Sequence, residues 1–265
     1  MSKTKLAYVA GLAALLVTAL VSHLRATPYN NYVLLAQAFL HGHAWIDWPG
    51  EYIDALGYAG QHYVIEAPLP AILLVPYVAL FGLHANQTFL SIVLAGVAVG
   101  AAWELGERFG VCASSNAWIC AFLLAGTDLL WCAMLGDVWF VAHVAAVCFT
   151  MLVLVELAGR RRGWVVALWA ACAFESRFSM IGAIPVYAYL LVAPGLCSGT
   201  QSCHPESFDS AQDRLRAAGA QSKDEGTAAK GAALVSFAGV LVMVALLWVW
   251  YNRARWGTWS DIGYT

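Results

Sequence analysis

The stretch WFVAHVAAVCFTMLVLVELA, residues 139–158, decides the fold class of this chain. It is twenty residues long and carries one residue that is charged at neutral pH, Glu156, close to its end. A bilayer core about 30 Å thick needs about 20 apolar residues in a helix that crosses it. Lipid offers the backbone no hydrogen-bond partners, so a crossing segment has to be helical. The stretch therefore predicts a transmembrane helix.

Six further apolar stretches repeat this pattern, so we expect about seven transmembrane helices and an all-α polytopic membrane protein. The composition agrees: 61% of the residues are hydrophobic and 11% are charged, whereas about 25% are charged in a soluble domain. The net charge of −2 argues against nucleic-acid binding, which needs a basic surface. The six stretches lie near residues 6–23, 87–105, 114–132, 164–176, 179–194 and 231–250.

Residues 69–83 form another apolar run, which Pro70 and Pro76 interrupt. We interpret it as a re-entrant or interfacial helix, because cytoplasmic loops are enriched in Lys and Arg. With seven spans and a cytoplasmic N-terminus, ten basic residues lie inside and four outside. Counting 69–83 as a span would move Arg160–Arg162 outside. The first apolar run is long for a secretory signal, and no small-x-small site follows it, so we expect an uncleaved anchor.

This topology gives a long first external loop from about Leu24 to Asn86 and a short second one at Gly136-Asp137. Residues 195–230 are polar and of low complexity, and we expect them to form a cytoplasmic insert. Cys197, Cys203 and His204 lie in this insert, but their spacing alone does not identify a metal site.

The first external loop contains most of the candidate functional residues, because acids, histidines and aromatic residues are frequent there. Residues 30–40 have apolar side chains at helical spacing, which predicts a helix lying in the membrane interface. Aromatic residues at this depth can also be a plain interfacial belt. The acids of this loop are Asp47, Glu51, Asp54 and Glu66, and the other polar candidates include His62 and Tyr63.

Other candidates lie close to the expected ends of spans. Asp137 has two interpretations, an external acidic site or the N-cap of the span that follows it. Glu175 and Arg177 straddle the break between the fifth and sixth spans, where charges usually pair or line a cavity. Arg253 and Arg255 follow the last span, and both fit either phosphate binding or interface anchoring. His143 lies inside a span, and we interpret it as an interior side chain.

Four segments resemble a known group of bacterial membrane proteins, the GT-C glycosyltransferase superfamily near the dolichyl-phosphate-mannose–protein mannosyltransferase-like (family 39) set. The resemblance covers most of the chain outside residues 197–230. It implies a module of seven helices whose first external loop carries interfacial helices. The segments are PYNNYVLLAQAFLHG (28–42), GYAGQHYVIEAPLPAILLVPYVALFG (57–82), GT and GDVWFVAH within 126–143, and YNRARWGTWSDIGY (251–264).

The resemblance implies transfer of a sugar from a polyprenyl-phosphate donor to an acceptor at the external face of a bacterial inner membrane. An acid of the first loop would take the acceptor proton. Asp54 ranks first, because similar proteins commonly carry an acid before the GYAGQHYV run. A cation would meet the phosphate, either an arginine or a divalent metal, and we assign no metal ligands. The other catalytic candidates are Asp137, Asp47 and Glu66, and the substrate-binding candidates are Arg177, Glu175, His62, Tyr63 and Arg253.

The chain departs from the family where relatives often place acids, because it has Asn30, Asn31 and Gln37 there. An amide cannot act as a base, so a non-catalytic relative that binds lipid or acts as an assembly partner is an alternative. A transporter is a further alternative, although the sequence shows no convincing internal repeat. Family members usually continue beyond such a module, so we expect residues 1–265 to lack a C-terminal part of it.

Overall fold

The computed structural model describes residues 3–47, 51, 53–193 and 225–259. In chain order its elements are α1 (Lys3–Ser22), α2 (Asn31–Leu40), β1 (Ala55–Tyr58), β2 (Gln61–Val64), α3 (Leu69–Phe81), η1 (Gly82–His84), α4 (Gln87–Arg108), α5 (Ala113–Ala125), α6 (Leu129–Leu135), α7 (Val138–Leu157), α8 (Gly163–Phe174), η2 (Phe178–Ala183), α9 (Ile184–Val192) and α11 (Glu225–Trp256).

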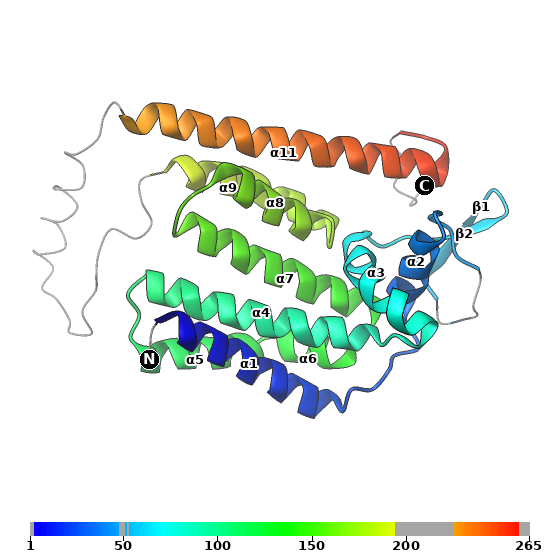
Figure 1. Cartoon of the computed structure of the whole chain (residues 1–265), viewed down its shortest axis with the longest axis horizontal. Helices are drawn as coiled ribbons and strands as arrows, with labels where there is room; N and C mark the ends of the chain where they lie inside the picture. The colour runs from blue at the N-terminus through cyan, green and yellow to red at the C-terminus, as the bar shows by residue number, and fades with distance from the viewer. Residues whose placement is uncertain (1–2, 48–50, 52, 194–224, 260–265) are drawn as a thin grey trace, which may run out of the picture.

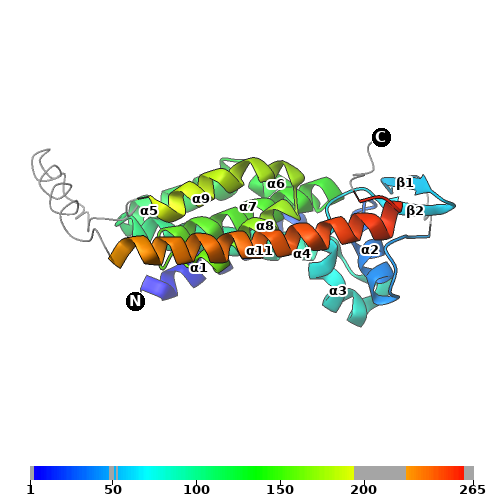
Figure 2. The same ribbon diagram turned by 90° about the horizontal axis from the view of Figure 1, so that it is seen from above.

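The long helices form a bundle in which α1 packs on α4, α4 on α7, α7 on α8 and α8 on α11 (Figure 1). The short helices α2 and α3 and the strands β1 and β2 gather at one end of this bundle, where α11 also finishes. Figure 2, turned by 90°, also shows these short elements at one end of the bundle. We call this end the loop end. Helix α1 begins at the opposite end, and the described residues of the predicted external loop gather at the loop end.

Several helices are long and apolar enough to cross a membrane, as expected of an all-α membrane protein. In the described part of the chain these are α1, α4, α7 and α11, and α5 with α6 form a fifth if the 49° bend between them lies within one span. The stretch expected as one straight span at 114–132 is therefore broken near Gly126. Helices α8 and α9 have 12 and 9 residues, fewer than the about 20 that a straight crossing needs. The expected count of seven spans is not confirmed.

The run at 69–83 forms a short helix at the loop end, in agreement with the interfacial interpretation. Helix α3 has 13 residues and packs mainly against α2. Pro70 occupies its first turn, where a proline removes no helical hydrogen bond. The backbone N–H of Leu69 donates to the carbonyl oxygen of Glu175 at 3.0 Å. This bond joins the start of α3 to the end of α8.

Helices α1 and α4 approach closely because glycines face each other. A Cβ atom added at Gly11 would lie 2.9 Å from the carbonyl oxygen of Gly96, and one added at Gly96 would lie 2.9 Å from that of Gly11. Gly100 lies one turn further along the same contact. Small residues at such positions let two helix backbones meet without side chains between them.

Strands β1 and β2 form a hairpin that the sequence analysis did not predict. They pair antiparallel, from Ala55 opposite Val64 to Tyr58 opposite Gln61. The turn residues Ala59 and Gly60 both have positive φ angles, 51° and 78°, as a two-residue type I′ turn requires. The hairpin lies between the two segments that carry Asp54 and Glu66, so it brings these segments together.

The end of the bundle opposite the loop end carries paired arginines. The Arg162 guanidinium donates to both carboxylate oxygens of Glu156, at 3.0 and 2.9 Å. Arg108 pairs with Glu104 at 2.9 Å. The Arg160–Arg162 cluster thus lies far from the first-loop acids, as the predicted topology requires.

Most of the predicted insert, residues 194–224, lies outside the described residues, and so do Cys197, Cys203 and His204. The last residues of the predicted insert, 225–230, are helical, because α11 begins at Glu225.

Candidate functional site

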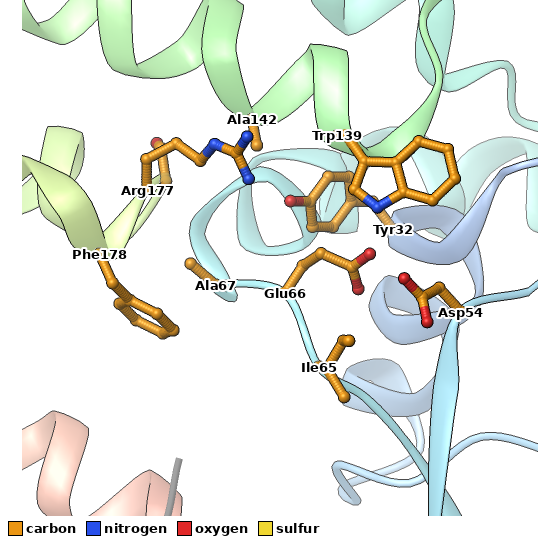
Figure 3. A pocket seen from close by; sticks show the side chains of 10 residues that line it. Tyr32, Asp54, Ile65, Glu66, Ala67, Trp139, Ala142, Arg177 and Phe178 are labelled. Carbon is orange, nitrogen blue, oxygen red and sulfur yellow. The ribbon is translucent and has the colours of Figure 1, made fainter. Parts of the chain in front are cut away.

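A small polar pocket at the loop end brings together three residues that the sequence analysis selected. Asp54, Glu66 and Arg177 line it, and Figure 3 shows the Glu66 carboxylate turned toward that of Asp54. Tyr32 of α2 and Trp139 of α7 lie beside the two acids (Figure 3). The cavity has a volume of about 80 Å³. Its full lining is Tyr32, Asp54, Ile65, Glu66, Ala67, Trp139, Ala142, Ser176, Arg177 and Phe178.

Asp54 is held at the pocket by the amide side chain of Asn31, one of the three amide residues that the sequence analysis noted in residues 30–37. The side-chain nitrogen of Asn31 donates to the backbone carbonyl oxygen of Asp54 at 3.0 Å. Asn31 is fully buried in α2, so this bond fixes the chain just before β1 to the interfacial helix. Asn31 therefore positions the segment that carries an acid instead of supplying one.

Glu66 is a buried acid whose carboxylate contacts no hydrogen-bond partner among the described residues. It lies two residues after the end of β2 and is 8% exposed, and both of its side-chain oxygens are buried without a hydrogen-bond partner among the described residues. The pKa of Glu66 is raised to about 7, mainly by burial and to a smaller extent by the nearby charge of Asp54, while a backbone hydrogen bond and the charges of Arg255 and Arg177 act in the opposite direction. An acid with such a pKa is suited to move a proton near neutral pH.

The raised pKa predicts that Glu66 makes stability depend on pH. The pKa rises from 4.5 to about 7 on folding, so the favourable contribution of the protonated acid is complete below about pH 4.5 and is lost as pH rises through about 7. The loss between pH 5 and pH 8 is about 2 kcal/mol. The variant Glu66→Gln should lack this loss, because an amide does not ionise. Thermal melting in detergent at both pH values measures the difference, and equal pH dependence of the two proteins would contradict it.

Arg177 reaches the pocket from the connection between α8 and η2. Its backbone N–H donates to Ala173 at 3.0 Å, and the neighbouring Ser176 hydroxyl donates to Cys172 at 2.8 Å. Phe178 on its other side packs on Trp248 of α11, with ring centroids 6.1 Å apart. The backbone at Arg177 is therefore fixed on both sides. Its guanidinium contacts the imidazole of His143, which is exposed on α7 and is not the interior side chain that we expected.

The two arginines at the end of α11 have different surroundings. Arg253, the one predicted to bind substrate, is exposed and lies over the ring of Trp259, 5.3 Å from its centroid. Arg255 is 4% exposed; it donates to the carbonyl oxygen of Val64 and lies 4.6 Å from the ring centroid of Trp256. Arg255 thus joins the end of α11 to the hairpin, beside the pocket.

Helical spacing predicts an aromatic contact for Arg255 but does not separate it from Arg253, because Trp250 and Trp256 each lie three residues from Arg253. Tyr251 precedes Arg255 by four residues, which places both on one face of a helix. The guanidinium indeed lies 5.0 Å from the Tyr251 ring centroid, at the distance of a cation–π contact. No comparable spacing in the sequence connects Arg177 with His143.

The remaining predicted residues lie outside the pocket. Asp137 stands at the N-cap position of α7 but makes no capping hydrogen bond, and its carboxylate accepts the hydroxyl of Thr27 instead. Asp47 is exposed. His62 and Tyr63 belong to β2, where the Tyr63 ring packs against Trp256.

An apolar groove lies next to the polar pocket, between α3, α8 and α11. Its volume is about 510 Å³. Glu175 is the one charged residue among the side chains that line the groove. Arg177, two residues later in the chain, lines the polar pocket, so the same short segment contributes to both cavities. The lining consists of Phe39, Pro68, Leu69, Ile72, Val75, Leu168, Ala171, Cys172, Glu175, Val244, Leu247, Trp248, Trp250 and Tyr251.

Among the described residues, no group of three or more His, Cys, Asp or Glu side chains is placed to hold a metal ion. Asp54 and Glu66 supply two carboxylates at the pocket. A hard divalent cation takes six or more oxygen ligands, so an ion between these acids would take most of its ligands from substrate and water.

No protein-family model matches the chain, and no curated protein or solved structure is detectably similar to it. The resemblance to GT-C glycosyltransferases therefore stays a prediction.

Proposed function

We propose that this chain is a GT-C-type glycosyltransferase, which moves a sugar from a polyprenyl-phosphate-linked donor to an acceptor at the extracytoplasmic face of a bacterial inner membrane. The observation that carries the proposal is the meeting of Asp54, Glu66 and Arg177 in one pocket beside a large apolar groove. These residues come from distant parts of the chain, and together they supply an acid–base pair and a cation. A lipid-linked sugar needs both of these and an apolar surface for its chain.

The donor fits the site in two parts. A guanidinium pairs well with a phosphate because its planar array of donors matches the phosphate oxygens, so the donor phosphate lies at Arg177. The groove between α3, α8 and α11 receives the first isoprene units of the lipid chain. Its lining is apolar along both walls, and its Glu175 end lies next to Arg177 in the chain.

The chemistry assigned to the pocket is a displacement at the anomeric carbon. The bond from this carbon to the phosphate oxygen breaks, and its electron pair leaves with the phosphate at Arg177. An acceptor oxygen bonds to the carbon and gives its proton to Asp54, which is less buried than Glu66 and so is open to an acceptor that arrives from water. Glu66, with a pKa of about 7, is partly protonated at neutral pH and then donates a hydrogen bond to a sugar hydroxyl or phosphate oxygen.

The proposal includes an orientation and a span count. The N-terminus and the Arg160–Arg162 cluster lie in the cytoplasm, and the loop end lies in the extracytoplasmic space, as the excess of basic residues at the opposite end favours. In the seven-span form, α8 and the η2–α9 segment also cross, and the bilayer adapts to their short apolar lengths.

A second candidate function is binding of a polyprenyl phosphate without sugar transfer. The pocket volume of about 80 Å³ favours it, because small-molecule sites usually measure roughly 300–1,000 Å³. Transfer would require the pocket to widen around the sugar, whereas a phosphate alone needs less room.

Reconstituted protein tests the proposal directly. The purified chain in liposomes receives a radiolabelled hexose on polyprenyl phosphate, together with a membrane extract as a source of acceptor, and donor consumption is measured. Consumption that depends on Asp54 supports glycosyl transfer. Saturable binding of the donor without consumption, at any extract concentration, would reject transfer and leave the lipid-binding function.

A further inference from the structure

His143 stands out on α7 because it is polar and exposed within an apolar helix. It is the one basic side chain between Val138 and Leu157. A polar group on the surface of a membrane-spanning helix is costly unless it has a partner. In the folded chain the partner of His143 is Arg177, thirty-four residues later in the sequence.

The contact involves one particular edge of the guanidinium. Nε of Arg177 donates toward Nδ1 of His143 at 3.4 Å, and Nη2 makes the closer contact, with Nε2. A neutral imidazole has one accepting nitrogen, so it accepts a hydrogen bond from one of these two guanidinium nitrogens, and the tautomer decides which one. Nη1 makes no hydrogen bond within the described part of the chain, and Arg177 is one of the residues that line the pocket.

This contact restricts a side chain that is otherwise flexible. An arginine has about 2 kcal/mol of rotamer entropy to lose when it is fixed in one geometry. His143 fixes the Nε–Nη2 edge before any ligand arrives, and the backbone on either side of Arg177 is already held by Ser176 and Phe178. A guanidinium fixed in this way loses less entropy when it binds an anion.

We propose that His143 is a positioning residue, which holds the Nε–Nη2 edge of the Arg177 guanidinium so that Nη1 meets the phosphate of a polyprenyl-phosphate ligand. The inference rests on the proposed binding of such a lipid, and it adds a residue that acts through Arg177 without touching the ligand. The function of His143 is then to supply a neutral acceptor, and any side chain that supplies one at this place can replace it.

Binding of radiolabelled polyprenyl monophosphate to the purified chain in detergent tests the inference. His143→Leu should raise the dissociation constant about tenfold, because a hydrogen bond to a charged group contributes on that scale. His143→Gln keeps an acceptor and should stay within about twofold of the wild-type value. In an Arg177→Gln background, His143→Leu should have no further effect. Melting temperatures of all variants show whether each one folds.

The outcomes separate the inference from the proposed function. If the wild-type chain does not bind the lipid, the proposed function fails and the inference fails with it. If the wild type binds and His143→Leu binds equally well, only the role of His143 is overturned. The same holds if His143→Gln loses as much affinity as His143→Leu, or if the loss persists without Arg177, because either result would show that His143 does not act through a hydrogen bond to Arg177.

Discussion

Replacing Asp54 with asparagine is expected to lower kcat/KM for sugar transfer by about 100-fold or more, the usual contribution of a positioned general base. The substitution removes the group that accepts a proton and leaves the rest of the site unchanged. Asparagine keeps the size of the side chain, and the bond from Asn31 to the backbone at residue 54 does not involve the carboxylate. The variant should therefore fold and bind the donor, while it lacks a group that takes the acceptor proton.

The matched control is Asp137→Asn, which makes the same chemical change at the same end of the bundle but outside the pocket. An asparagine oxygen can still accept the hydroxyl of Thr27, so we expect transfer within about threefold of wild type. Initial rates with the reconstituted protein, at several donor concentrations, measure both variants. A large loss in the Asp137 variant together with a small loss in the Asp54 variant would place the base in the second external loop, and the site assigned to the pocket would be wrong.

Replacing Arg177 with glutamine is expected to raise the dissociation constant for a polyprenyl phosphate about 100-fold. Loss of one partner from a desolvated charge pair costs about 2–5 kcal/mol, and the donor phosphate would lose its cation. Arg177→Lys should recover part of this affinity, because it keeps the charge but not the planar pair of donors. Equilibrium binding of the radiolabelled lipid measures the effect without any requirement for turnover.

Arg253→Gln is the control for this prediction, because Arg253 is exposed and its contact is with Trp259. It removes the same charge from the same end of the bundle. We expect a change of about twofold or less, since an exposed charge is screened by solvent. If Arg253→Gln weakens binding as much as Arg177→Gln does, a general electrostatic attraction explains the affinity, and a phosphate site at Arg177 does not.

The order of the long helices and the side of the first-loop acids follow from local sequence. Apolar length predicts α1, α4 and α7 within a few residues, because a backbone in lipid has no alternative to helical hydrogen bonds. The prolines in residues 69–83 and the basic residues at 160–162 were enough to place α3 at the loop end. The apolar stretch at 164–176 is shorter than a straight crossing requires, and α8 accordingly has 12 residues.

The residues that line the pocket do not follow from local sequence. Five acids and two arginines were candidates, and Asp54 ranked first among the acids only through the family resemblance, because no rule of spacing ranks residues that lie in separate segments. Glu66 gains its raised pKa from burial under surrounding elements, and the hairpin between Ala55 and Val64 sets its distance from Asp54. The turn Ala59-Gly60 gives only a weak hairpin signal, because the preferred sequences for this turn begin with Asn, Asp or Gly.

Hydrophobic length and charge act locally along each segment, so the sequence alone predicts a helical membrane protein whose first-loop acids lie far from the Arg160–Arg162 cluster. The fold is needed to show that Asp54, Glu66 and Arg177 share a pocket, that Asp137 and Arg253 do not line it, and that His143 contacts Arg177. Those choices depend on how helices rotate and pack against one another, and this rotation is set by contacts between residues far apart in the chain, such as Gly11 with Gly96 and Arg255 with the carbonyl oxygen of Val64.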